Sequence, residues 1–154
     1  MPLLEVIAAV TARVKAVESA KNVYSYARDV KEQKDFVALF QDPQNKKLHT
    51  WMVTREGTPA QDDGVGTYRR PHRIAIMGYY SVDDANNSEG TFQQIVEDVC
   101  NAFDPLPLRQ YDGKYDWSRP CQVEGPTVLM YGSYLCHAVK IVHVVEELLY
   151  EQPS

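Results

Sequence analysis

The clearest hydrophobic pattern in this chain is an alternating stretch from Thr67 to Val82, followed by a polar turn and an amphipathic segment ending at Phe103. A period of two is typical of a strand, whereas spacings of three and four are typical of a helix. The apolar face of the expected helix consists of Phe92, Ile95, Val96, Val99, Cys100 and Phe103. A strand that leads into a helix of this kind predicts an α+β domain.

A second amphipathic pattern lies at the start of the chain and predicts a helix over residues 3–18. Its apolar stripe is Leu3, Ile7, Val10, Val14 and Val17. A coiled coil needs at least about three heptads, and this stripe covers only about two. We therefore expect the helix to pack on a sheet.

The rest of the chain predicts shorter elements separated by breaks. Asn86 to Glu89 resembles a capping box at the start of the central helix. The remaining expected elements are a strand over 22–27, a brief helix over 35–40, and strands over 47–55, 127–131 and 135–146, with 149 as the furthest end of the last strand.

Two segments lack a core-forming pattern. Residues 56–66 predict a mobile loop, and residues 104–126, rich in Pro and Gly, predict an irregular arm. Pro71 lies inside the expected long strand and lacks a backbone N–H. We therefore expect this part of the strand at a sheet edge or at a bulge.

Composition limits the class of protein. The chain has 154 residues, which suits a single domain over 1–154. Its net charge of −5, without a basic block, argues against binding nucleic acid by phosphate neutralisation. Three widely spaced cysteines fit a reducing compartment rather than a disulfide framework. Without a basic leader or an apolar run of about 20 residues, we expect a cytoplasmic protein with no membrane partner.

Tests for catalytic, cofactor or metal chemistry select no site. Gly64 and Gly66 are followed by Arg69 where a dinucleotide fingerprint needs a third glycine. His137 and His143 would lie about 20 Å apart on one strand, too far to share a zinc ion. Cys121 has no identifiable base nearby. We expect no catalytic residue, cofactor or metal, although a carboxylate acid–base pair stays open.

The order of elements resembles that of the tail terminator, or tail completion, proteins of long-tailed bacteriophages. The resemblance is carried by residues 3–7, 49–55, 70–80 running into 88–103, and 135–145. It implies a mixed, mostly antiparallel sheet flanked by the N-terminal helix and the central amphipathic helix.

The resemblance also implies a structural virion protein rather than an enzyme. Its copies would form a six-fold ring that caps the tail tube and joins it to the head and neck. The implied partners are other copies of the chain, the tail tube protein and a neck or head-completion protein. DNA would pass through the lumen without specific binding, and the ring would be assembled in the host cytoplasm.

On this hypothesis, charged residues near the expected loop are candidates for the interface with a subunit or the tube. Arg69, Arg70 and Arg73 form a positive cluster that could face acidic residues of an adjacent subunit. Asp62 and Asp63 belong to the loop that would become ordered on assembly. Two alternatives are another neck or head-completion protein, and a small cytoplasmic enzyme or ligand-binding domain that uses the tyrosine-rich sheet.

Overall fold

The computed structural model describes residues 3–26, 40–42, 47–59, 68–103, 110–111 and 113–149. Within these ranges, two α-helices, α1 (Leu3–Lys15) and α3 (Ser88–Asn101), accompany a short 3-10 helix, η1 (Asp84–Asn86). The strands are β1 (Val23–Tyr24), β2 (His49–Gly57), β3 (Tyr68–Ser81), β4 (Tyr115–Asp116), β5 (Gln122–Tyr131) and β6 (Tyr134–Leu149).

The strands form one sheet in which β3 and β6 are central. The order is β1-β2-β3-β6, and both β4 and β5 pair with the far side of β6. Among the described strands, only the β1–β2 pair is parallel, and the other pairs are antiparallel. The predicted α+β fold with a mixed, mostly antiparallel sheet and two flanking helices is therefore confirmed.

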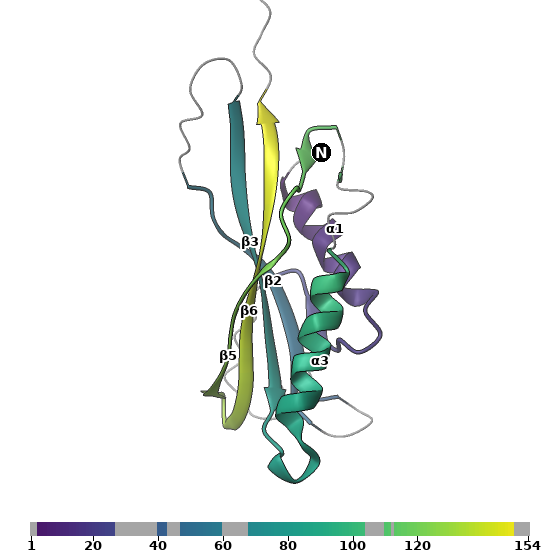
Figure 1. Cartoon of the computed structure of the whole chain (residues 1–154), viewed down its shortest axis with the longest axis vertical. Helices are drawn as coiled ribbons and strands as arrows, with labels where there is room; N and C mark the ends of the chain where they lie inside the picture. The colour runs from purple at the N-terminus through teal and green to yellow at the C-terminus, as the bar shows by residue number, and fades with distance from the viewer. Residues whose placement is uncertain are drawn as a thin grey trace, which may run out of the picture.

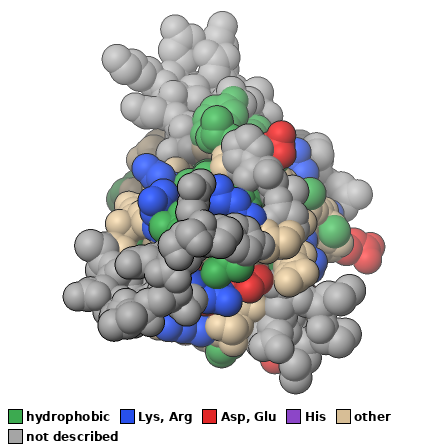
Figure 2. All heavy atoms as spheres, turned by 90° about the horizontal axis from the view of Figure 1, so that it is seen from above, with side chains coloured by type: hydrophobic (Ala, Val, Ile, Leu, Met, Phe, Trp, Pro, Cys, Tyr) green, Lys and Arg blue, Asp and Glu red, His purple; other side chains and the backbone are tan. Residues whose placement is uncertain are grey.

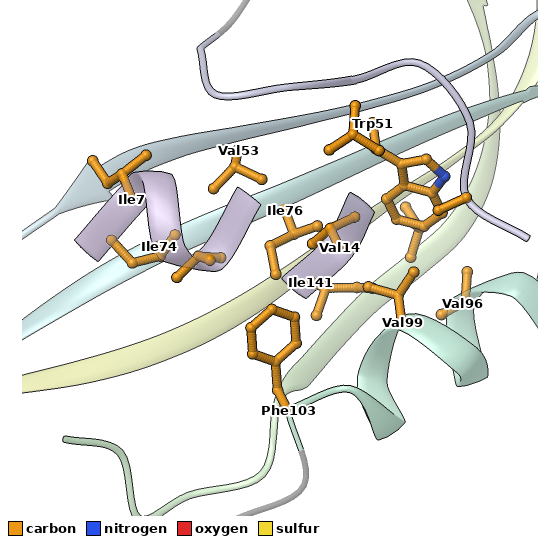
Figure 3. Packing of buried hydrophobic residues seen from close by; sticks show 14 of the residues in the cluster. Ile7, Val14, Trp51, Val53, Ile74, Ile76, Val96, Val99, Phe103 and Ile141 are labelled. Carbon is orange, nitrogen blue, oxygen red and sulfur yellow. The ribbon is translucent and has the colours of Figure 1, made fainter. Parts of the chain in front are cut away.

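Both helices pack on the same face of the sheet (Figure 1). Their apolar stripes meet the strand residues that point toward them, as the close-up in Figure 3 shows. The labelled core residues are Ile7 and Val14 of α1, Trp51 and Val53 of β2, Ile74 and Ile76 of β3, Val96 and Val99 of α3, Phe103, and Ile141 of β6. Full burial of one such side chain contributes about 1.5–3 kcal/mol before entropy is subtracted.

Gly78 of β3 allows the closest approach in this core. A Cβ at this position would lie 2.5 Å from the indole ring of Trp51, which is fully buried. Trp51 and Gly78 are direct cross-strand partners. The glycine therefore leaves room for the largest side chain of β2.

A smaller cluster covers part of the opposite face. It contains Phe40, Leu48, Met52 and Cys136, with several tyrosines at its border. Tyr79 stacks on Tyr131 there, with ring centroids 4.2 Å apart. Tyr80, its neighbour in sequence, packs instead in the main core, so the two tyrosines occupy opposite faces of the sheet.

The predicted strands at 47–55, 67–82 and 135–149 are confirmed, with ends shifted by a few residues. The strand predicted over 22–27 is only two residues long. α1 ends at Lys15 rather than residue 18, because the Val17 N–H donates to the Val14 carbonyl in a tight turn. Among the described residues, Pro71 pairs with β6 only, because β2 ends at Gly57 opposite Arg73. Pro71 therefore lies at a local sheet edge, as predicted.

Two local predictions are wrong. The arm over 104–126 is not irregular throughout, because it contains β4 and the first half of β5. The Gly125–Pro126 pair that indicated a loop falls at a register shift between Glu124 and Thr127, which an edge strand tolerates.

The expected capping box at Asn86 is also absent. The N-cap is Asn87, whose side chain accepts a hydrogen bond from the Gly90 N–H, while Asn86 belongs to η1. Of the brief helix expected over 35–40, only Phe40 is described, and residues 60–66 of the expected loop likewise lie outside the described residues.

Candidate subunit interface

The predicted arginine cluster lies at the end of the molecule where β3 begins and β6 ends. Figure 2 looks onto this end and shows Lys and Arg side chains gathered on it. Arg69 Nη1 lies 3.2 Å from Asp116 Oδ1 and 3.3 Å from Glu146 Oε2. Arg73 Nε lies 3.5 Å from a carboxylate oxygen of Glu56. The sheet therefore supplies these two arginines with acidic partners from their own chain.

Arg70 is the most weakly held member of the cluster. Its side chain is 51% exposed, and its Nη1 lies 3.7 Å from Glu147 Oε1. A contact at this distance leaves the guanidinium able to bind an outside carboxylate. Asp62 and Asp63, the acidic candidates, lie outside the described residues.

Glu147 is the centre of a polar cluster that the sequence did not predict. Its carboxylate lies 2.8 Å from His72 Nε2 and 2.9 Å from Lys114 Nζ. Burial alone would raise the pKa of Glu147, but hydrogen bonds from Lys114 and His72 outweigh burial and hold it below its usual value. His72 Nδ1 in turn lies 2.8 Å from the Thr58 hydroxyl.

The result is a hydrogen-bonded chain from Thr58 through His72 to Glu147. A sequence signal for it existed: Glu147 continues the odd-numbered, core-facing positions of β6, where an unpaired carboxylate would be costly.

Two other histidines are buried and neutral. The Trp51 indole N–H donates to His49 Nε2 at 2.9 Å, and the Tyr111 hydroxyl lies 2.7 Å from His143 Nε2. Burial lowers the pKa of His49 to about 4 and that of His143 to about 3. His143 Nδ1 has no hydrogen-bond partner among the described residues. Within the described ranges, no group of His, Cys, Asp and Glu is arranged to hold a metal ion.

The thiols are poor nucleophiles in this environment. Burial raises the pKa of Cys121 to about 12 and that of Cys136 to about 11, and it also raises the pKa of Cys100. The thiolate is the reactive form of cysteine. All three side chains are therefore protonated at neutral pH.

The most unusual surface feature is an exposed apolar hairpin formed by residues 123–135 of β5 and β6. Five of the seven large apolar side chains exposed in the described part of the chain lie on it. They are Val123, Val128, Leu129, Met130 and Leu135, with exposed fractions between 39% and 59%. Isolated exposed apolar side chains are ordinary, but contiguous ones mark interaction sites.

The hairpin is apolar on both faces. Val128 lies opposite His137, and Met130 lies opposite Leu135, so that Val128, Met130 and Leu135 share one face. Leu129 points to the other face. Sequence reasoning identified this strand but not its exposure, because a run of apolar residues is also typical of a strand in the core.

A groove continues the hairpin surface toward α3. It has a volume of about 350 Å³ and is lined by Val96 and Cys100 of α3 and by Val123 and Pro126 of β5, among others. The apolar surface of β5 therefore borders a groove against α3, whose other lining residues include Gln93 and Glu97.

None of the helices in the described ranges is both long enough and apolar enough to cross a bilayer.

No family model matches this chain, and no curated protein matches it. Thirteen chains of solved structures resemble it. One of them, a protein named only by a sequence identifier, has a TM-score of 0.50 and 14% identity, covering 93% of this chain and 89% of its own. At that identity the likeness concerns the fold alone.

Proposed function

We propose that this protein is a bacteriophage tail terminator whose copies form a ring that caps the tail tube and joins it to the head and neck. Its work is geometric: one face of the ring stops polymerisation of the tube, and the other receives the neck proteins. A closed ring of identical subunits requires two different complementary patches on each subunit.

The observation that carries this proposal is the apolar hairpin. A chain with a net charge of −5 is protected from non-specific association over most of its surface, yet it leaves five large apolar side chains exposed on one hairpin. Water contact at these side chains is unfavourable, and burial against another protein surface removes it. A structural subunit that functions only in an assembly has a use for such a surface.

The charged end of the molecule supplies a second, chemically different surface. Arg70 extends from the start of β3, and its contact to Glu147 is long, at 3.7 Å. We propose that it registers the subunit against an acidic surface of a neighbour or of the tube. The acidic balance of the chain suits a ring through which DNA slides, because adhesion to DNA comes from cationic contacts.

The proposal is tested by mixing the purified protein with polymerising tail tubes and imaging the products by negative-stain electron microscopy. We expect ring-shaped density at one end of each tube and a shorter mean tube length as the protein is added. Tubes with bare ends and unchanged lengths would refute the proposal. Rings that bind isolated neck proteins but never tubes would favour the alternative of another neck or head-completion protein.

One observation favours a small enzyme as the second candidate. The Thr58 hydroxyl lies 2.8 Å from His72 Nδ1, and His72 Nε2 lies 2.8 Å from Glu147 Oε1. These are the distances expected between a nucleophile, a base and a carboxylate that orients the base. A His72→Gln variant tests this role. Loss of a hydrolytic activity that the wild-type protein shows toward model esters, with folding retained, would favour the enzyme over the ring.

A further inference from the structure

We propose that the outer edge of β5, over residues 127–130, is the seam by which one subunit docks on a second copy of this chain. This inference rests on the proposed function and names the surface that would join neighbouring subunits. Among the described residues, β5 pairs with β6 on one side only, so the backbone N–H and C=O groups on its other side are available for a further strand or loop.

This edge lacks the features by which edge strands usually avoid association. Between Gly125 and Cys136 the chain contains no Lys, Arg, Asp or Glu. The register shift at Glu124/Thr127 and the nearby Pro126 hinder pairing with a further strand only in the first half of β5. The second half is regularly paired to β6 and uncharged, which makes it a template for pairing.

The absence of charge favours a second copy as the occupant. Two copies of this chain each carry −5, so most ways of bringing them together place like charges near one another. An uncharged strand is the part of the surface where such subunits can meet without repulsion. A strongly cationic partner would instead gain more by docking where carboxylates are exposed.

The side chains fit a contact that surrounds the edge. Val128 and Met130 lie on one face of the hairpin and Leu129 on the other, and all three are exposed. A neighbour that adds backbone to the edge would contact both faces at once, as in β-strand addition. The groove between α3 and β5, lined by Val96 and Val123, adjoins the same edge and would receive a side chain from that neighbour.

The contact in a ring must be heterologous, so the edge would dock on a different surface of the next subunit rather than on its own copy. Pairing of one β5 edge with another about a two-fold axis would close at two subunits. The mass of the assembly therefore distinguishes the two proposals. Docking through the seam predicts association through β5, and a ring predicts that this association continues beyond a dimer.

The test is native mass spectrometry and light scattering of Val128→Lys with Met130→Lys, compared with wild type over a range of concentrations. Both side chains are more than half exposed, so the fold should tolerate lysine. Leu4→Lys with Ala12→Lys is the matched control, because it adds the same charge at exposed positions of α1. We expect the hairpin variant to associate about a hundredfold more weakly, at about tenfold per buried side chain, and the control to resemble wild type.

Hydrogen exchange on wild type provides a second measurement that needs no variant. Amides of residues 127–130 should become more protected as concentration rises, while those of α1 should not. If the hairpin variant forms rings as readily as wild type, docking through the seam is refuted and the proposed function is unaffected. A wild-type dimer that the variant abolishes would support the seam and overturn the ring. A wild-type monomer at every concentration, with protection of β5 only when tail tubes are added, would overturn the seam in favour of the tube.

Discussion

Two buried histidines should make the stability of this protein fall steeply between pH 6.5 and pH 4. His49 is 2% exposed and His143 is fully buried, and both rings are neutral in the folded state. Unfolding transfers them to water, where their pKa returns to the ordinary value of 6.5. Below that pH the unfolded chain binds two protons that the folded chain does not.

The magnitude follows from the two pKa differences. Because the folded pKa is lowered, the stabilising contribution is complete above pH 6.5 and is lost as the pH falls toward about 4 for His49 and about 3 for His143. Each histidine changes the free energy of unfolding by up to about 1.4 kcal/mol per pH unit. At pH 5 the loss is about 2 kcal/mol for each and about 4 kcal/mol in total, a large part of the ordinary 5–15 kcal/mol of domain stability.

The assay is urea unfolding at pH 7.5, 6.5, 5.5 and 5.0, followed by the fluorescence of the buried Trp51 and Trp117 at one fixed protein concentration. Carboxylates with a lowered pKa, such as Glu147, lose their contribution only below about pH 4.5, so they do not interfere. His49→Gln and His143→Gln keep a hydrogen-bonding side chain and should each remove about half of the slope. A wild-type stability that is flat from pH 7.5 to 5.0 would refute the reasoning, as would an unchanged slope in the double variant.

Gly78→Ala should lower the free energy of unfolding by about 1–3 kcal/mol, because its Cβ would meet the Trp51 indole at 2.5 Å. Gly57→Ala is the control and should be nearly neutral in the same urea titration, because no atom lies within 4 Å of its Cβ. Equal effects of the two substitutions would contradict the packing described for β2 and β3. Replacing residues 60–66 by a Gly-Ser linker of the same length should preserve the melting temperature and reduce ring formation; a large loss of stability would assign this segment to the core. Arg70→Gln should change stability by less than about 1 kcal/mol, since its ion pair is long and half-exposed, and should weaken association measured by light scattering. Association as strong as wild type would remove Arg70 from the interface.

The sequence was sufficient to predict the elements that carry a clear period. The alternation around Ile74 and Ile76 and the helical stripe ending at Phe103 each reflect a single buried face, and a buried face imposes its period on the sequence. The placement of Tyr79 and Tyr80 on opposite faces is a consequence of the same alternation. Features that depend on one element alone were therefore predictable.

Features that depend on contacts between distant segments could not be predicted from the sequence. The cluster at Glu147 forms because β3 and β6 pair in a register that places His72 opposite Val145, one core-facing step from Glu147. No local pattern fixes that register. The exposure of Val128 and Met130 was equally hidden, because an apolar run indicates burial and does not say whether the chain itself supplies the covering surface.

The proposed role as an assembled ring at the end of a tail tube is tested by the number of copies of the protein bound to each tube. Tubes capped by the purified protein can be separated from free subunits by sedimentation, and the bound protein can be counted per tube by quantitative mass spectrometry. A ring at the tube end predicts a fixed number of copies per tube, equal to the symmetry of the tube and independent of its length. Binding in proportion to tube length, or no binding at all, would contradict it.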